Sequence, residues 1–123
     1  MTLTPEEIAE GEAMTEIEAG VWELIQLARG RSQAISRASL SDHLRADDRS
    51  VRTAINSLVI NYKKPIMSDY HHGGYFLPSG EEEVVSYVKT LSNHTLSMMR
   101  RLAVFKKVTL QELMAEYQTE LPP

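Results

Sequence analysis

The spacing of apolar and polar positions predicts a mainly helical chain. Over residues 12–29, apolar side chains return every three or four positions, which is the spacing of one buried helix face. We expect one long helix there, ended by Gly30. Its inward face would consist of Met14, Ile17, Val21, Leu24, Ile25 and Ala28. Before it, Thr4-Pro5-Glu6-Glu7 predicts the start of a short acidic helix that ends at Gly11.

Two shorter helices are predicted next, at Arg37 to Leu44 and at about 48–61. Ser36 and Asp47 precede them and are good N-caps, because their side-chain oxygens can accept hydrogen bonds from first-turn amides. The predicted buried stripes are Leu40 and Leu44 in the first helix and Val51, Ile55, Leu58 and Val59 in the second. Two amphipathic helices separated by so few residues indicate a helix-turn-helix.

The second of these helices leaves polar side chains on its outer face. They are Arg49, Ser50, Arg52, Thr53 and Asn56. Guanidinium, hydroxyl and amide groups are those that reach phosphates and base edges in the major groove of DNA. Arg37, Lys63 and Lys64 flank this helix and are predicted to contact phosphates, which sets position without reading sequence.

A β-hairpin is predicted after this helix. Ile66-Met67 and Tyr75 to Leu77 are β-prone runs, and Gly73-Gly74 between them supplies the backbone freedom that a hairpin turn needs. The hairpin tip carries His71 and His72, which either contact the DNA backbone or minor groove or are simply solvated polar residues. A very short strand is also predicted at Gln33 to Ile35.

This order of elements resembles a winged helix-turn-helix, and is most similar to the N-terminal DNA-binding domain of biotin-operon repressors and related small bacterial or phage regulators. The resemblance is carried by Ile35 to Leu58 and Gly73 to Pro78, and with the first helix it covers roughly half of the chain. It implies a mostly α, α+β domain over 12–78, with a three-helix core and a β-hairpin wing. It also implies sequence-specific binding of double-stranded DNA as a small transcriptional regulator. The family usually has glycine between the two short helices, where this chain has Arg45-Ala46.

A C-terminal helical extension is predicted over 79–121. Ser79-Gly80-Glu81-Glu82 is typical of a capping box. Apolar positions then repeat at spacings of four and three, the heptad pattern of paired helices, at Val84, Val88, Leu91, Met98, Leu102 and Phe105, with Thr95 in the same series. We expect this seam to form a homodimer, although a helix lying on its own domain also needs one apolar stripe. Ser92-Asn93-His94-Thr95 is expected to weaken the middle of the helix or kink it.

A last helix is predicted to open with the capping box Thr109-Leu110-Gln111-Glu112. Its expected inward residues are Leu110, Leu113, Met114 and Tyr117.

The distribution of charge supports a nucleic-acid partner more than the net charge of −4 does. Residues 1–28 hold seven Glu and no Lys or Arg, whereas residues 29–72 hold eight Lys or Arg against four Asp. The basic segment therefore coincides with the predicted DNA-reading helices. The chain has no cysteine and no apolar run of membrane-spanning length, which fits a cytoplasmic protein without a membrane partner.

Catalysis and metal binding have little support. Ser41-Asp42-His43 contains the residue types of a catalytic triad, but consecutive helical positions point about 100° apart. His71 and His72 are neighbours that would point to opposite faces of a strand, and no HExxH spacing occurs. We therefore expect no enzyme, no cofactor and no metal. The alternative function is a winged-helix protein-interaction module in a phage or replication assembly, which the acidic first segment favours.

Overall fold

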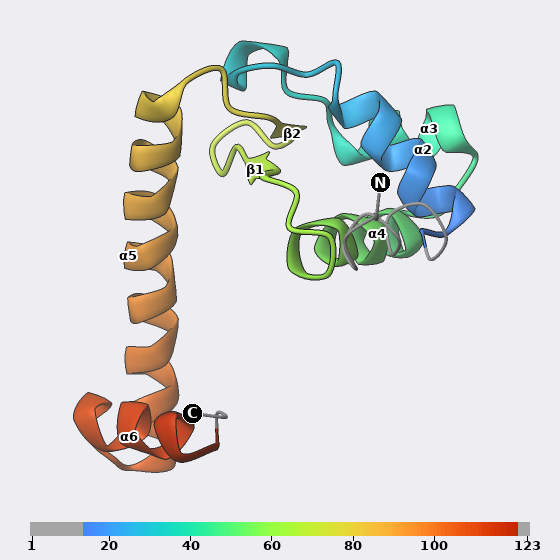
Figure 1. Cartoon of the computed structure of the whole chain (residues 1–123). Helices are drawn as coiled ribbons and strands as arrows, with labels where there is room; N and C mark the ends of the chain where they lie inside the picture. The colour runs from blue at the N-terminus through green and yellow to red at the C-terminus, as the bar shows by residue number, and fades with distance from the viewer. Residues whose placement is uncertain (1–13, 121–123) are drawn as a thin grey trace, which may run out of the picture. The chain divides into compact units, whose positions relative to one another are not determined.

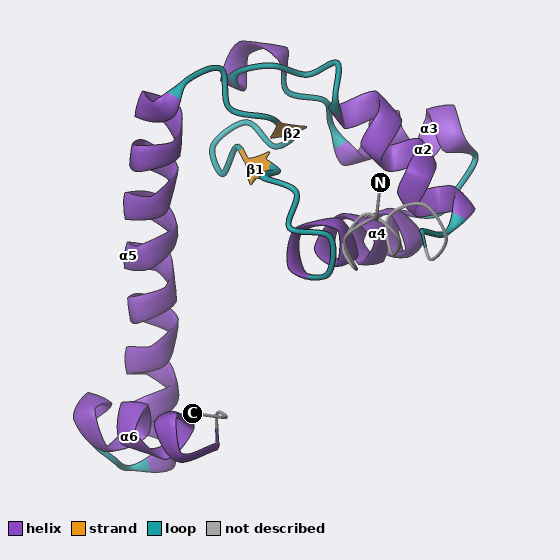
Figure 2. Ribbon diagram, in the orientation of Figure 1, coloured by secondary structure: helices purple, strands orange, loops and turns teal. Residues whose placement is uncertain are grey.

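The computed structural model describes residues 14–120, and this part of the chain is mostly helical with one small sheet. It contains five α-helices, one 3-10 turn and a two-stranded antiparallel hairpin (Figure 2). The predicted α+β class is confirmed, and the order of elements is compatible with a winged-helix layout. The acidic helix expected at 4–11 lies outside the described residues. The chain divides into two compact units between Glu83 and Val84, which we call the N-terminal and C-terminal units.

Three helices form the core of the N-terminal unit: α2 (Glu16–Ile25), α3 (Arg37–Leu44) and α4 (Asp48–Ile60) (Figure 1). Helix α2 packs mainly against α4, and α3 contacts both. The side chains buried between them include Val21, Ile25, Leu40, Val51, Ala54, Ile55 and Leu58. Each large apolar side chain buried here contributes about 1.5–3 kcal/mol, so this cluster fixes how α4 is held.

Helix α2 ends earlier than predicted. It stops at Ile25 instead of continuing to residue 29. The backbone beyond it pairs with the end of the hairpin: the Leu77 amide donates to the Ala28 carbonyl at 2.7 Å, and the Gly30 amide donates to the Leu77 carbonyl at 2.8 Å. Ala28 is buried, as its place in the apolar pattern predicted. The segment after Ile25 is nevertheless not part of the helix.

The short strand predicted at Gln33 to Ile35 was wrong. Arg31–Gln33 forms a single 3-10 turn, closed by hydrogen bonds from the amides of Gln33 and Ala34 to the carbonyls of Gly30 and Arg31. The amides of Gln33 and Ala34 are hydrogen-bonded within this turn, so Ile35 alone pairs with Tyr75. Their amides and carbonyls exchange hydrogen bonds of 2.8 and 2.9 Å.

Helices α3 and α4 have the predicted caps and nearly the predicted boundaries, since α4 ends at Ile60, one residue earlier than expected. The Ser36 hydroxyl accepts from the Ser39 amide at 3.1 Å, and the Asp47 carboxylate accepts from the Ser50 amide at 2.9 Å. Arg45 adopts the left-handed conformation, with φ of 51°. This residue takes the place of the expected glycine, at a cost on the order of 1 kcal/mol. The turn is therefore made without glycine.

The hairpin consists of β1 (Met67–Ser68) and β2 (Tyr75–Phe76), paired with Met67 opposite Phe76 and Ser68 opposite Tyr75. We call residues 67–76 the wing. A side chain at Gly74, where φ is 104°, would place its Cβ 3.2 Å from the Ile35 carbonyl oxygen. The glycine thus lets the wing lie close to the segment that precedes α3.

Helix α5 (Glu81–Lys106) begins with a carboxylate cap, but the residue differs from the predicted one. Glu83, not Glu82, reaches back to Ser79, and its Oε1 accepts from both the backbone amide and the hydroxyl at 2.8 Å. The Oε2 of Glu83 accepts from the Arg31 amide at 3.0 Å. This second hydrogen bond explains why Glu83 forms the cap and Glu82 does not. Helix α5 is continuous, so the polar residues 92–95 do not interrupt it.

The C-terminal unit has a small buried interior. Helix α6 (Leu110–Glu120) starts with the predicted capping box, in which Thr109 and Glu112 exchange hydrogen bonds. Leu113 is fully buried, as predicted. Met114 and Tyr117 were expected to point inward but are each 43% exposed. Among the described residues of this unit, only Ala103 and Leu113 are buried. Two helices alone therefore do not form an interior large enough to cover Met114 and Tyr117.

Candidate nucleic-acid interface

The outer face of α4 carries three polar side chains at helical spacing. Arg49, Thr53 and Asn56 are all exposed. They lie opposite the buried stripe of the same helix, because positions four and seven apart return to one face. Since the buried side of α4 packs against α2 and α3, the helix backbone is fixed and presents a guanidinium, a hydroxyl and an amide in a row along this face.

Two of the predicted DNA-contacting cations, one from the phosphate set and one from the outer face of α4, share one carboxylate. The Nε of Arg37 lies 2.6 Å from Oδ1 of Asp48, and Nη1 of Arg52 lies 3.7 Å from Oδ2. Hydrogen bonding to the Tyr75 hydroxyl and to Asp48 raises the pKa of Arg37. The structure therefore places Arg37 and Arg52 together at the start of α4, where Asp48 offsets part of their charge. Neither pair was predicted from the sequence. The i, i+4 spacing of Asp48 and Arg52 is a local signal that could have indicated one of them, whereas no local pattern indicates the pair of Arg37 and Asp48.

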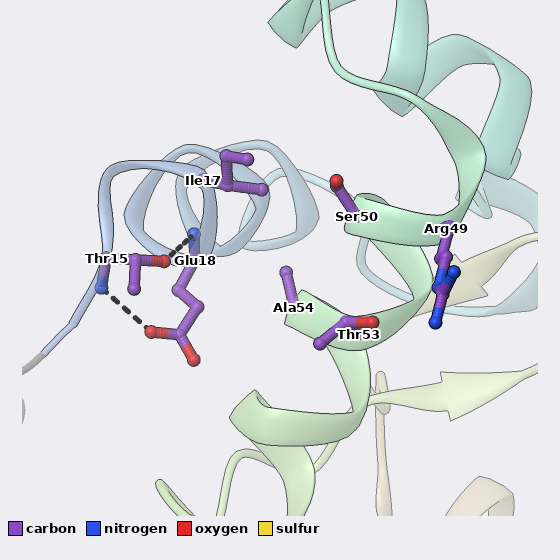
Figure 3. Close-up of a pocket in the computed structure, with 7 residues that line it drawn as sticks. All are labelled: Thr15, Ile17, Glu18, Arg49, Ser50, Thr53 and Ala54. Carbon is purple, nitrogen blue, oxygen red and sulfur yellow. Dashed lines mark hydrogen bonds between the residues drawn. The ribbon is translucent and has the colours of Figure 1, made fainter.

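Ser50 does not belong to the outer face. It is half-buried, and Figure 3 shows its side chain pointing toward α2. It lines a hollow of about 360 Å³ between the start of α2 and α4, together with Thr15, Ile17, Glu18, Arg49, Thr53 and Ala54. Arg49 and Thr53 thus border this hollow as well as the outer face of α4 (Figure 3). The prediction that Ser50 faces outward was wrong because its position lies at the edge of the buried stripe.

Glu18 is a buried carboxylate beside this hollow. It closes a capping box in which its Oε1 accepts from the Thr15 amide at 2.8 Å and its own amide donates to the Thr15 hydroxyl at 3.1 Å (Figure 3). Burial by itself would raise the pKa of Glu18, but hydrogen bonds from Ser57 and Thr15 outweigh it and lower the pKa. The ionised carboxylate therefore ties α2 to α4 through Ser57.

We expect Glu18 to make the N-terminal unit less stable in acid. Because its pKa is lowered by folding, the unfolded chain binds more protons, so stability is gained above the unfolded pKa of about 4.3 and lost as the pH falls through the folded value. Urea unfolding followed by Trp22 fluorescence checks this. The difference in unfolding free energy between wild type and Glu18→Gln should be larger at pH 7 than at pH 3. An equal difference at both pH values would contradict the assignment.

Both lysines after α4 have structural contacts. The Nζ of Lys63 donates to the Ile60 carbonyl at 2.8 Å and so caps the end of α4. The Nζ of Lys64 lies 4.7 Å from the centroid of the Trp22 ring, a cation–π contact. Lys63 is exposed and Lys64 is half-buried. The predicted phosphate contacts therefore have to coexist with these contacts.

A buried aspartate shapes the tip of the wing. The Oδ1 of Asp69 accepts from the backbone amides of His71 and His72, at 3.1 and 3.3 Å. Burial opposes ionisation of Asp69, but these hydrogen bonds and nearby His72 lower its pKa. The two imidazoles are exposed at the tip, as predicted. Within residues 14–120 no group of three or more His, Asp or Glu side chains is arranged to hold a metal ion.

One side chain of the outer face was missed. Ile60 is 56% exposed and lies one turn after Asn56 on α4. Ile60 follows Asn56 by four positions, and this spacing indicates that the two side chains lie on the same helix face. An apolar group here suits contact with a thymine methyl group or with a protein.

Comparison of the chain with protein-family models, with curated proteins and with solved structures found no match. In the described part of the chain, no helix is long and apolar enough to cross a membrane.

Proposed function

We propose that this chain is a winged helix-turn-helix protein that binds double-stranded DNA in a sequence-specific manner, with α4 in the major groove. The observation that carries the proposal is the exposed row Arg49, Thr53 and Asn56 on a helix whose opposite side is fixed in the core. A rigid helix presenting base-reading groups is the arrangement that helix-turn-helix proteins use. The wing that follows α4 supports the same class.

The chemistry of this row suits base edges. Arginine can bind guanine through two hydrogen bonds, and asparagine can do the same with adenine. From Arg49 to Asn56 the helix rises about 10.5 Å, which corresponds to about three base pairs. Each copy would therefore read a short half-site, while Arg37, Arg52, Lys63 and Lys64 contact phosphates and His71 and His72 approach the backbone beside the groove. The role that fits is a small transcriptional regulator in the cytoplasm, without catalysis.

Substitutions in α4 and just after it separate base reading from phosphate contact. We expect Arg49→Ala and Asn56→Ala each to cost about 1–3 kcal/mol of discrimination at one base pair, because each removes a direct base contact. Lys63→Ala should weaken binding to every sequence alike, because a phosphate contact carries no sequence information. The measurement is fluorescence anisotropy with a selected site and with random duplexes.

Folding of the variants is the control for this experiment. Arg49→Ala and Asn56→Ala should give unchanged Trp22 fluorescence and unchanged unfolding midpoints. Lys63→Ala should lower the midpoint only slightly, because it removes the exposed hydrogen bond from Lys63 to the Ile60 carbonyl. If the three lose affinity for selected and random DNA in equal proportion, α4 is not the reading surface. If the folded wild type at tens of micromolar does not bind random duplex at about 50 mM salt, the DNA proposal fails.

A protein-interaction module is the second candidate function. It is favoured by exposed Ile60 on the outer face of α4 and by Asp48, which offsets the charge of Arg37 and Arg52. The two candidates differ in a simple assay: a DNA-binding protein is retained on heparin or random DNA at low salt, and an interaction module is not. Ile60→Lys separates them further, because added charge should strengthen DNA binding and weaken an apolar protein contact.

A further inference from the structure

Exposed apolar side chains gather in the C-terminal unit. Of the thirteen large hydrophobic residues exposed in the described part of the chain, ten lie there. They are Val84, Val85, Val88, Leu91, Met98, Leu102, Val104, Phe105, Met114 and Tyr117. Two buried residues cannot offset the entropy of ordering two helices, so this unit needs a partner surface.

The exposed apolar positions of α5 are ordered and not scattered. Val84, Val88, Leu91, Met98 and Leu102 follow the heptad spacing and are 37–55% exposed along one continuous helix of 26 residues. A sustained heptad stripe is the pattern by which helices pair with other helices of the same kind. We propose that α5 pairs with α5 of a second copy of this chain, in antiparallel orientation.

Charge decides the orientation. The first turn of α5 carries Glu81, Glu82 and Glu83, whereas Arg100 and Arg101 lie near its other end and are exposed. Parallel pairing would place the three carboxylates of one copy beside those of the other, and the arginines likewise beside each other. Antiparallel pairing brings the acidic end of each helix to the basic end of its partner and also complements the two helix dipoles.

The heptad spacing also gives a register. An antiparallel pair centred on residue 93 places Val84 opposite Leu102 of the second copy, Val88 opposite Met98, and Leu91 opposite Thr95. Each of these pairs joins an a position of one helix to a d position of the other, which is how antiparallel heptad helices pack. It also puts Thr95 against a leucine, whereas a parallel pair would stack it on a second Thr95. The polar middle of the helix is thus accommodated without a polar layer.

The length of the paired helices can be compared with the spacing of DNA half-sites. Only this comparison depends on the proposed DNA binding. In this register the two copies of Glu81 lie 24 residues apart along the paired helices, or about 36 Å. Two DNA half-sites one helical turn apart are separated by about 34–36 Å. The starts of the two paired helices would therefore be separated by about the distance between adjacent half-sites.

Self-association is tested without DNA, by sedimentation velocity of the full chain. We expect a mass of twice 13.9 kDa at tens of micromolar. Val88→Glu should weaken the dimer at least about tenfold, because it buries a carboxylate in the seam. The matched control is Val104→Glu, the same change at a residue that is 73% exposed on the other side of α5, and it should remain dimeric. A monomeric wild type at 100 μM, or equal weakening by both variants, overturns the proposal; the monomeric outcome would mean that the seam packs on its own chain.

Orientation is tested by disulfide formation, because the chain has no cysteine of its own. Val84→Cys and Leu102→Cys are made separately and oxidised alone and as a mixture. Antiparallel pairing predicts little cross-linking of either variant alone and strong cross-linking in the mixture. Cross-linking of each variant with itself, with none between the two variants in the mixture, would show parallel pairing and overturn the proposal. Because neither test involves DNA or α4, its result is independent of whether DNA binds.

Discussion

Raising the salt concentration from about 50 to about 200 mM is expected to weaken binding to random duplex DNA by roughly 100-fold. If about four phosphates are neutralised by the cations around α4, the affinity falls with a slope near −3.6 on logarithmic axes, since each phosphate contributes about −0.9. The affinity is measured by fluorescence anisotropy at four or five salt concentrations. A slope near zero would mean that the basic segment makes no phosphate contacts.

Asp48→Asn is the control that the structure offers for this slope. Its carboxylate holds Arg37 at 2.6 Å and Arg52 at 3.7 Å, and the amide removes the negative charge with almost no change of shape. We expect affinity for random DNA at low salt to rise several-fold and the slope to steepen by about one. An unchanged slope would mean that these two arginines lie away from the phosphates. This variant also separates the two candidate functions, since a protein-binding surface would not gain DNA affinity in this way.

Local chemistry explains what the sequence predicted well. The caps at Ser36, Asp47 and Thr109 each depend on residues within three positions, so a short motif contains the whole interaction. The buried stripe of α4 likewise depends only on helical period, and Val51, Ile55 and Leu58 are buried as predicted. Exposure of Arg49, Thr53 and Asn56 follows from the same period. That they read DNA remains a proposal.

Long-range contacts explain what the sequence did not predict. Helix α2 ends early because Ala28 pairs with Leu77, and the cap of α5 moves to Glu83 because Arg31 offers a second amide. The pairing of Arg37 with Asp48 crosses the turn between two helices. In each case the partner is distant in sequence, so no local pattern contains the information.

The exposed face of α4 depends on the packing beneath it, and Leu58→Ala should therefore destabilise the N-terminal unit strongly. Leu58 is fully buried, and removing its side chain leaves a cavity among α2, α3 and α4. We expect a loss of about 2–5 kcal/mol in the free energy of unfolding, measured by urea unfolding with Trp22 fluorescence. Trp22 is the only tryptophan and packs against this core, so the signal reports this unit.

The matched control is Leu27→Ala, the same change at a side chain that is 78% exposed. It should alter the free energy of unfolding by no more than about 0.5 kcal/mol. Equal losses in the two variants would mean that Leu58 is not the centre of the core on which α4 rests. If Leu58→Ala also weakens specific DNA binding under conditions where it is still folded, while Leu27→Ala does not, then rigid support of α4 is itself required for reading. That result would link the buried side of the helix to the work proposed for its exposed side.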